Sequence, residues 1–230
     1  IRTNGDIHFN ESEFNQLLLA QPKISPSCAD ILSVISECTS IFIDHMNQLY
    51  CSRKEKHQVV IMNIQGELNI NKRIGNGKPG LKPSLLDSPT GIFVDRNSNL
   101  YVADSGNHRI QLFSKGNEKG ETIVGNLPSN GLRFPTGIVV DRDGNLFIAD
   151  YGNHRIVMSA KHGIRCIVGC SETNRVQHPE ALWFDHIGNM FVLCNEKKQI
   201  LKFSLITHDQ SMHEKITKYM KTTLIYSHFR

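Results

Sequence analysis

Residues 136–158 read TGIVVDRDGNLFIADYGNHRIVM, and residues 90–113 read TGIFVDRNSNLYVADSGNHRIQLF. The two stretches share an aspartate, a short polar turn, an apolar run and a second turn that ends in Asn-His-Arg-Ile. Self-similarity of this kind is typical of a repeat architecture. The chain is therefore expected to consist of copies of one structural unit.

Two further stretches repeat the pattern more loosely. Residues 40–62 read SIFIDHMNQLYCSRKEKHQVVIM, and residues 181–203 read ALWFDHIGNMFVLCNEKKQILKF. The first aspartates of the four copies are Asp44, Asp95, Asp141 and Asp185. They fall 44 to 51 residues apart, close to the length of a four-stranded propeller blade. A leucine-rich or β-helix solenoid would need repeats of roughly twenty to thirty residues, so the spacing favours a propeller.

A partial fifth copy opens the chain. Residues 3–9, TNGDIHF, match the slots that residues 142–148, RDGNLFI, fill in one of the clear repeats. We therefore expect the chain to begin inside a blade, near the end of that blade's first strand, and to be a fragment of a longer propeller. The partial unit and the four complete units are expected near residues 1–20, 40–75, 90–125, 136–170 and 181–205.

Each complete unit is expected to form four short strands joined by turns. Residues 136–141 are a β-branched apolar run, which predicts an inner strand buried on both faces. The Asp-Gly dipeptide after this run is typical of a tight hairpin with positive φ angles. Residues 146–150 are expected as the second strand, residues 155–158 as the start of the third, and residues 165–169 as the fourth. No unit shows helical periodicity.

The predicted fold class is all-β, with four complete blades and one partial blade. Each blade is a four-stranded antiparallel sheet, and radial closure lets neighbouring blades cover one another. Residues 1–205 are expected to form this propeller. Residues 206–230 break the pattern and predict a C-terminal tail or a closing segment.

The composition is that of an ordinary globular protein. The chain has 230 residues, of which 39% are hydrophobic, and a formal net charge of +4. No run of about eighteen apolar residues occurs, so no membrane insertion is expected in this segment. The positive charge is too small to predict nucleic-acid binding by itself.

The stretches VADSGNHRIQLF and IADYGNHRIVM closely resemble the NHL repeat, which is named after an Asn-His-Leu pattern at this turn. The matching residues are Asn107 with His108 and Asn153 with His154. The resemblance covers about residues 1–205 and implies a six-bladed propeller whose remainder lies upstream. Segments around Cys51 and Cys166 are also similar to extracellular NHL proteins of small invertebrates. A more distant similarity is to the NHL domain of tripartite-motif proteins.

Oppositely charged residues flank one turn in both clear repeats. Asp104 ends one strand and Arg109 begins the next, and Asp150 and Arg155 stand in the same positions. A charged clamp for a ligand is one interpretation. A cross-strand pair that fixes the hairpin is favoured, because the pair recurs whereas a ligand would need blade-specific groups. In the looser repeats both partners are replaced together, which also indicates pairing. The replacements are Arg53 with Gln58 and Cys194 with Gln199.

Three histidines share one slot of the repeat. His57, His108 and His154 occupy it, and Lys198 fills it in the last unit. Three histidines suggest a zinc site, but equivalent slots of different blades lie around a ring, whereas zinc ligands must lie about 2 Å from the metal. We therefore expect each histidine to serve its own turn, and we predict no metal and no cofactor.

The segments that lead into the first strands bear on a possible enzymatic role. Peptidylglycine amidating lyases resemble NHL propellers and place metal-binding histidines near the axis. The corresponding slots here follow Pro89, Pro135 and Pro179 and hold no histidine. The chain is therefore predicted to be non-catalytic, with a propeller lyase or hydrolase as a less favoured alternative.

Four of the six cysteines are placed for pairing. Cys38 and Cys51 flank the first hairpin of their blade. Cys166 and Cys170 lie on either side of Gly169, where a turn would bring the sulfurs together. We predict a disulfide in each pair, which favours an extracellular or secreted protein. A cytoplasmic location, with all six thiols reduced, is the alternative.

Basic and aromatic side chains gather at the turns after the second strands and in the segments that lead into the first strands. We expect these side chains to form a face that binds a protein partner. Binding of RNA, or substrate recognition for a ubiquitin ligase, is the alternative that the similarity to tripartite-motif proteins implies. Acidic neighbours and scarce aromatic side chains weigh against RNA. The predicted face comprises Lys54, Lys56, His57, His108, Arg133, Tyr151, His154, Arg175, His178, Lys197 and Lys198.

Overall fold

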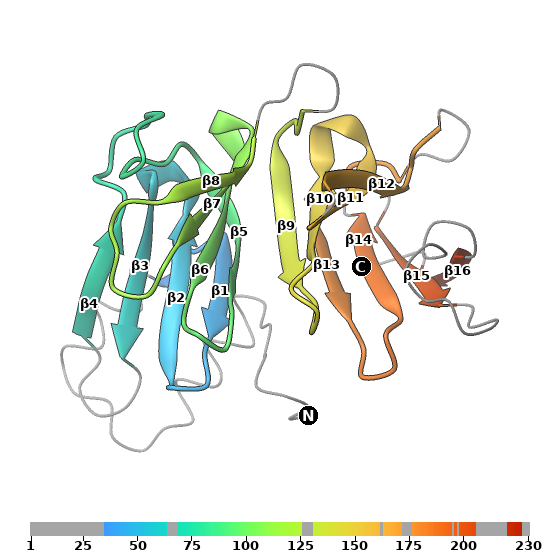
Figure 1. Cartoon of the computed structure of the whole chain (residues 1–230), viewed down its shortest axis with the longest axis horizontal. Helices are drawn as coiled ribbons and strands as arrows, with labels where there is room; N and C mark the ends of the chain where they lie inside the picture. Colours follow the sequence, from blue (N-terminus) through green and yellow to red (C-terminus); the bar gives the residue numbers. More distant parts are fainter. Residues whose placement is uncertain are drawn as a thin grey trace. The chain divides into compact units, whose positions relative to one another are not determined.

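The computed structural model describes residues 35–63, 69–125, 131–161, 163–171, 176–194, 196, 198–205 and 220–226. Within these ranges sixteen strands form four sheets of four strands each (Figure 1). The all-β class and the four complete four-stranded blades are confirmed. The predicted partial unit near residues 1–20 lies outside the described residues. No helix in the described part of the chain is long and apolar enough to cross a membrane.

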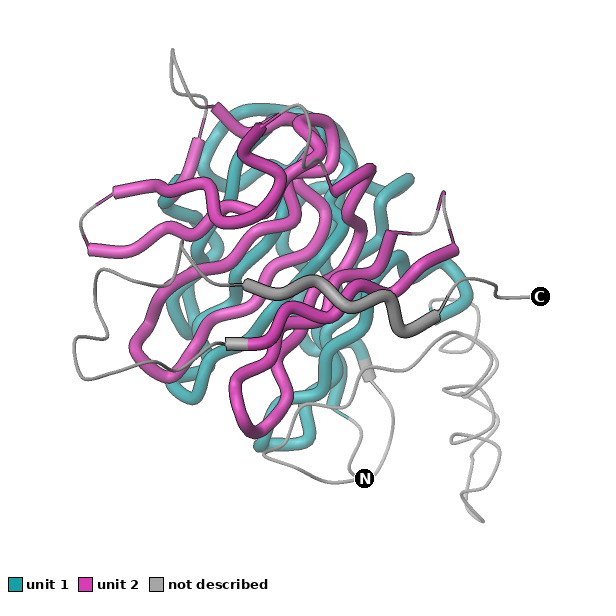
Figure 2. The backbone as a smooth tube through the Cα atoms, turned by 90° about the vertical axis from the view of Figure 1, so that its right-hand side faces the viewer, with its two compact units in different colours: residues 1–123 teal, residues 124–230 magenta. Residues whose placement is uncertain are grey.

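The chain divides into two compact units, residues 1–123 and residues 124–230 (Figure 2). The first sheet of unit 1 consists of β1 (Ser40–Ile43), β2 (Gln48–Arg53), β3 (Gln58–Asn63) and β4 (Asn69–Ile74). The second sheet consists of β5 (Pro89–Val94), β6 (Leu100–Asp104), β7 (Arg109–Phe113) and β8 (Glu121–Val124). In both sheets, strands that are consecutive in sequence lie side by side.

Unit 2 repeats this arrangement. Its first sheet consists of β9 (Pro135–Val140), β10 (Leu146–Asp150), β11 (Arg155–Ala160) and β12 (Gly163–Val168). Its second sheet consists of β13 (Ala181–Phe184), β14 (Met190–Cys194), β15 (Gln199–Leu205) and β16 (Met220–Tyr226). The stretch 206–230, expected as a tail or closing segment, thus supplies the fourth strand of the last blade, and β16 pairs antiparallel with β15.

Within each unit the later sheet packs on the earlier one through the same strands. In unit 1, β5 packs against β1 and β2, and in unit 2, β13 packs against β9 and β10. Apolar side chains fill the space between them; in unit 2 the rings of Phe147 and Phe184 meet edge to face, with centroids 4.8 Å apart. A blade therefore covers its apolar face with the next blade, as a repeat protein requires.

In the third blade the second strand is buried more deeply than the first, and the prediction that residues 136–141 are buried on both faces is wrong in this respect. Every residue of β10 is buried, whereas β9 has three residues that are only half-buried. The reason is that β9 lies at the edge of its sheet, while β10 has a strand on each side.

The first hairpin also differs from the tight turn expected at the Asp-Gly dipeptide. Among its residues only Gly144 has a positive φ, of 82°. The amide of Asp141 donates to the carbonyl of Asn145, so three residues form the loop. This is the three-residue hairpin that ends on a left-handed residue. In the other blades the left-handed slot holds Asn47, Ser98 and Gly188.

Candidate functional site

The turns after the second strands of the first three blades have the same backbone course. A short 3-10 helix, η2 (Ser105–Asn107) or η3 (Tyr151–Asn153), is followed by a histidine in the left-handed region. The φ angles are 55° at His108 and 57° at His154. His57 follows η1 (Lys54–Lys56) in the same way, with φ of 48°. The histidine slot of the repeat is therefore a left-handed turn position.

The predicted Asp–Arg pairs lie inside the fold. Nε of Arg109 donates to the carboxylate of Asp104 at 2.7 Å, and Asp104 is 0% exposed. The equivalent distance between Arg155 and Asp150 is also 2.7 Å. Burial raises the pKa of Asp104, while hydrogen bonds from its neighbours, including Arg109, counteract that effect. A group this deeply enclosed is positioned to hold the hairpin together.

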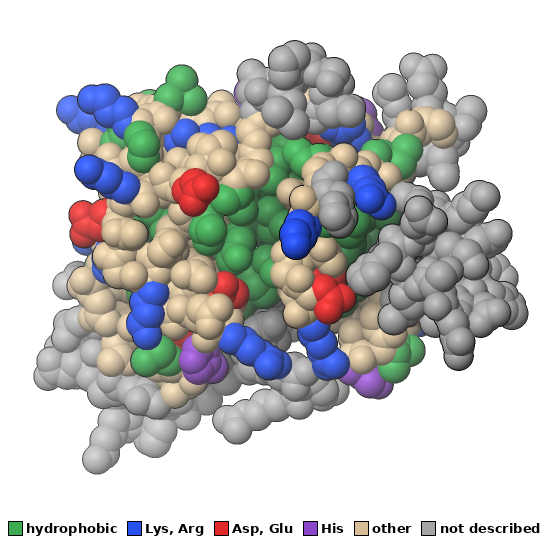
Figure 3. Space-filling view, viewed as in Figure 1, with side chains coloured by type: hydrophobic (Ala, Val, Ile, Leu, Met, Phe, Trp, Pro, Cys, Tyr) green, Lys and Arg blue, Asp and Glu red, His purple; other side chains and the backbone are tan. Residues whose placement is uncertain are grey.

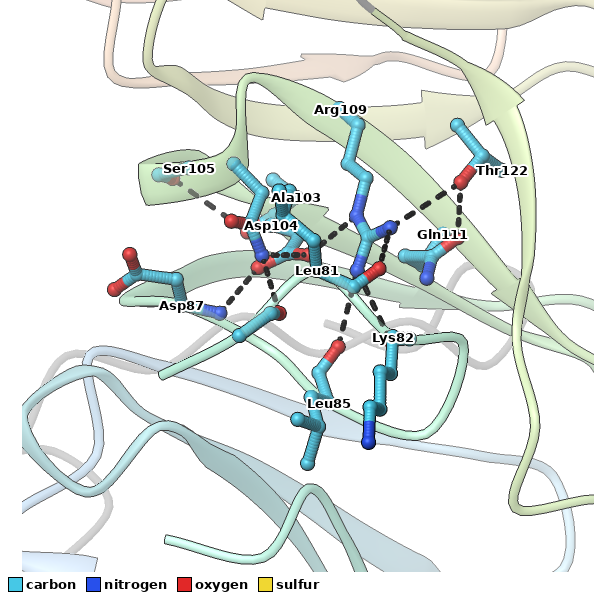
Figure 4. Close-up of polar contacts among 12 residues, drawn as sticks. Leu81, Lys82, Leu85, Asp87, Ala103, Asp104, Ser105, Arg109, Gln111 and Thr122 are labelled. Atoms are coloured by element: carbon cyan, nitrogen blue, oxygen red, sulfur yellow. Dashed lines mark hydrogen bonds and ion pairs between the residues drawn. The ribbon is translucent and has the colours of Figure 1, made fainter. Parts of the chain in front are cut away.

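The same pair fastens the lead-in segment, residues 80–87, to the hairpin (Figure 4). Arg109 donates to the backbone carbonyls of Leu81, at 2.9 Å, and of Leu85, at 3.1 Å. The backbone N–H of Asp87 donates to Asp104 at 2.6 Å. The polar atoms of Asp104 and Arg109 thus form hydrogen bonds with backbone groups of their own blade.

Two other blades keep this tether, the third with an equivalent aspartate and the first with an arginine in its place. In unit 2 the backbone N–H of Arg133 donates to Asp150 at 2.7 Å. In the first blade Arg53 stands where the repeat has aspartate, and it forms an ion pair with Glu37 of its own lead-in segment. The residue that ends the second strand therefore fixes the lead-in segment in all three blades.

The side chains of two repeat histidines reach the next blade. Nδ1 of His57 accepts a hydrogen bond from the backbone N–H of Ser88 at 3.0 Å. Nδ1 of His154 accepts one from the backbone N–H of His178 at 3.3 Å. The prediction that these histidines serve their own turns is therefore incomplete, because their side chains also join consecutive sheets.

In unit 2 this contact is part of a cluster of rings and a carboxylate, which we call the seam cluster: Tyr151, His154, His178 and Glu196. The ring of His178 stacks on Tyr151 at 4.6 Å and lies 4.1 Å from the ring of His154. Nδ1 of His178 contacts the carboxylate of Glu196. Burial, the nearby carboxylates of Glu196 and Glu180, and a hydrogen bond with Glu196 raise the pKa of Tyr151.

The structure thus brings together three residues of the predicted face, Tyr151, His154 and His178. Arg133 lies beside them, because its side chain and carbonyl pack on Gly152. The other described residues of the prediction lie at the equivalent turns of their own blades: Lys54, Lys56, His57 and His108 in unit 1, and Lys198 in the last blade of unit 2. Arg175 and Lys197 lie outside the described residues.

Charge on the visible surface is mixed. In each unit Lys and Arg side chains are scattered among uncharged ones, with Asp and Glu side chains between them (Figure 3). Among the described residues no group of three His, Cys, Asp or Glu side chains could hold a metal ion. No single sign of charge dominates the face in the view of Figure 3.

Sequence reasoning missed the partners of the histidines. Ser88 and His178 each precede a proline and have positive φ, 48° and 46°, as does Phe134 in the third blade. A left-handed residue before proline is uncommon. In the sequence, a proline recurs three residues before the isoleucine or leucine of the first strand. This recurrence is the feature that could have indicated a fixed backbone conformation at the residue before the proline.

Both predicted cysteine pairs are disulfide-bonded. The Cα atoms of Cys38 and Cys51 are 5.4 Å apart, and those of Cys166 and Cys170 are 5.6 Å apart. The first bond joins the segment before β1 to β2, and the second closes the turn at the end of β12. These separations are ordinary for disulfides.

Residues 86–113 and 132–157 match the family model of the NHL repeat. The chain carries NHL repeats. Each matched stretch begins in a lead-in segment and includes the turn with its histidine and the buried Asp–Arg pair. Comparison of the sequence with curated proteins finds no match.

Solved structures similar to these NHL repeats are β-propellers. A streptogramin B lyase has a TM-score of 0.57 at 14% identity, over 82% of this chain and 54% of the other. A gluconolactonase from Xanthomonas campestris has a TM-score of 0.55 at 16% identity, over 70% and 56%. A nidogen/laminin complex contains a chain with a TM-score of 0.53 at 17% identity, over 76% and 58%. The chain therefore spans about half the length of the structures that it matches, and at these identities the likeness concerns the fold.

Proposed function

We propose that this NHL-repeat chain is a non-catalytic scaffold that binds a protein partner outside the cell. The observation that carries the proposal is the position of the repeated charged residues. Asp104 and Arg109 are buried, and their polar atoms bond to the backbone of their own blade. The residues that recur thus build the fold, and the residues that vary between blades are left for recognition.

The varying positions carry side chains suited to protein contacts. Phe134 is 45% exposed in the lead-in segment of the third blade, and Tyr151 is half-buried in the turn beside it. Aromatic and arginine side chains are enriched where protein interfaces gain most of their affinity. The loop face of unit 2 combines both kinds of side chain.

The two disulfides support a location outside the cell. Disulfides persist in oxidising compartments and are rare in the cytosol. Each of these bonds closes a short stretch of chain, because the two cysteines are 13 positions apart in one pair and 4 positions apart in the other. Both are local, so they reinforce single blades.

The similar structures are compatible with this role. One of them is a complex of nidogen with laminin, and thus a propeller seen with a protein partner. The others include a lyase and a gluconolactonase. Because the shared feature is the fold, function must be argued from the residues of this chain. Those residues favour contact with a protein.

The test is a binding measurement with two matched variants. A partner isolated with the disulfide-bonded chain is purified, and its affinity is measured by interferometry for the native chain, Phe134→Ala and Ile187→Ala. Both residues are exposed and apolar, but Ile187, 66% exposed, lies in a first hairpin at the opposite end of the strands. We expect a loss of about tenfold for Phe134→Ala and a negligible change for Ile187→Ala.

Two results would contradict the proposal. Absence of any protein that binds the purified chain directly would remove the scaffold role. A partner whose affinity falls with Ile187→Ala but not with Phe134→Ala would move the binding surface to the other end of the blades.

A further inference from the structure

The two units contain equivalent seams between consecutive sheets. In each seam a repeat histidine accepts a backbone hydrogen bond from the residue before the proline of the next blade: Ser88 for His57 and His178 for His154. This backbone hydrogen bond is present in both seams, although the donor residue is a serine in one and a histidine in the other. The side chains at the variable slots of the seam are therefore not dictated by the repeat.

Those variable slots differ in chemistry between the seams. Three slots carry Tyr151, Glu180 and Glu196 in unit 2. The corresponding residues in unit 1 are Lys54, Thr90 and Gly106. The unit 1 seam is thus basic or small at positions where the unit 2 seam is aromatic or acidic.

The unit 2 side chains are ordered against one another. The rings of Tyr151 and His178 stack, and His178 contacts the carboxylate of Glu196. The side chain of Glu196 remains 52% exposed. A carboxylate held in place by a neighbouring ring, yet open to solvent, has already lost part of its rotamer freedom before a partner arrives.

We infer that the seam cluster, together with Glu180, recognises a cationic side chain of a protein partner, with arginine preferred over lysine. The inference rests on the proposed function as a protein-binding scaffold. A planar guanidinium can stack on an aromatic ring while it donates hydrogen bonds to a carboxylate. The seam cluster presents both groups within one small area.

The local charge is consistent with a cation as the occupant. Glu180 and Glu196 both act on Tyr151, and they raise the pKa of its hydroxyl in addition to the effect of burial. Arg133 packs beside the turn, and the ring of His178 contacts Glu196. A cation that approaches Tyr151 is attracted by the carboxylates of Glu180 and Glu196, so a cationic ligand is favoured there over an anionic one.

The experiment titrates the whole disulfide-bonded chain with an acetylated Gly-Arg-Gly amide. The same tripeptide with citrulline in place of arginine is the uncharged control. Binding is followed through the aromatic proton resonances of Tyr151 and His178. We expect saturable shifts with the arginine peptide that weaken as salt is added, and no saturable shift with the citrulline peptide.

Two variants carry the same substitution at the same repeat slot. Glu196→Gln changes the seam cluster, whereas Glu55→Gln changes the equivalent position of the first blade. We expect the affinity for the arginine peptide to fall about fivefold in Glu196→Gln and to stay unchanged in Glu55→Gln. Tyr151→Phe, which keeps the ring stack, serves as a second variant and should weaken binding less than Glu196→Gln.

The inference fails if the two peptides shift the resonances equally, or if Glu55→Gln weakens binding as much as Glu196→Gln. It also fails if a purified protein partner loses affinity with Phe134→Ala but is indifferent to Glu196→Gln. In that last case the scaffold function stands, and only the cation site is removed.

Discussion

Nδ1 of His57 accepts a hydrogen bond at 3.0 Å from the backbone N–H of Ser88, the residue that precedes the first strand of the next sheet. The histidine backbone meanwhile has a left-handed conformation, with φ of 48°. One residue therefore closes its own turn with its main chain and fastens the following blade with its side chain.

These two roles of His57 can be separated by mutation. Asparagine tolerates the left-handed region, so His57→Asn removes the bond to Ser88 together with the contact between Nδ1 and the Asp87 carboxylate, and it should lower the free energy of unfolding by about 1 kcal/mol. His57→Ala adds the left-handed penalty and should cost about 1–2 kcal/mol more. Urea unfolding measures both values. Equal stabilities of the two variants would contradict the left-handed role.

Breaking the buried pair of Asp104 and Arg109 should be severe. Asp104→Ala leaves the guanidinium of Arg109 buried without its carboxylate, and we expect a loss of about 3–5 kcal/mol. Adding Arg109→Met should recover part of that loss, because no unpaired charge then remains. Glu118→Ala, at an exposed position, is the control. If Asp104→Ala unfolds like the native chain, the pair does not hold the hairpin.

Substitutions in the left-handed slot of the first hairpin should change the stability of the fold in opposite directions, according to whether glycine is removed or introduced. An added Cβ at Gly144 meets no atom within 4 Å, so Gly144→Ala tests the φ angle of 82° alone and should cost about 1–2 kcal/mol. Ser98 occupies the same slot with φ of 61°, and Ser98→Gly should stabilise by about 1 kcal/mol. Changes of the same sign in thermal unfolding would refute this explanation.

Acid should weaken the last blade through Asp185. Partial burial acts to raise the pKa of Asp185, but hydrogen bonds from Asn189 and Ile187 outweigh it and lower the pKa below the ordinary value of 3.8. The stabilisation is therefore complete above the unfolded pKa and is lost as pH falls through the folded pKa. Asp185→Asn should reduce the difference in unfolding free energy between neutral pH and pH about 3.

The control for this acid response is Asp143→Asn. Asp143 lies exposed in the corresponding hairpin of the third blade, and its replacement removes the same charge. We expect its pH dependence to follow the native chain. If both variants respond alike, the effect arises from net charge and not from the hydrogen bonds of Asp185.

Thiol titration tests the oxidised state. With Cys38–Cys51 and Cys166–Cys170 bonded, at most two of the six cysteines can react in the denatured, non-reduced chain. The measurement is made with a chromogenic disulfide reagent in guanidinium chloride, and a reduced sample provides the total. Four or more reactive thiols in secreted protein would show that at least one of the two bonds is not formed.

The repeat itself was predictable, because strand alternation, turn residues and the spacing of Asp104 and Arg109 are local features of the sequence. That β10 is more deeply buried than β9 was not predictable in the same way, since it depends on which strand lies at the sheet edge. Residues 206–230 were predicted only as a tail or a closing segment, because residues 206–219 separate β16 from β15 and carry no repeat signal.

The seam cluster illustrates the same limit. Tyr151, His154 and His178 were identified by type, but nothing local to the sequence shows that the His178 ring stacks on a tyrosine 27 positions earlier. Glu196 was recognised only as a charge that dilutes a basic face. Its role depends on the side-by-side placement of two sheets, which single-sequence periodicity does not contain.

The hydrogen bond from the backbone of Asp87 to Asp104 has a consequence for how this chain tolerates changes in length. It spans 17 residues, the bond from Arg133 to Asp150 also spans 17, and the pair of Glu37 and Arg53 spans 16. The distance between successive repeats nevertheless varies from 44 to 51 residues. Length variation is thus confined to the stretch between one blade's third strand and the next blade's anchor. Insertions there leave every anchored interval intact, so new loops can be acquired or grafted at that edge while the blades continue to fold.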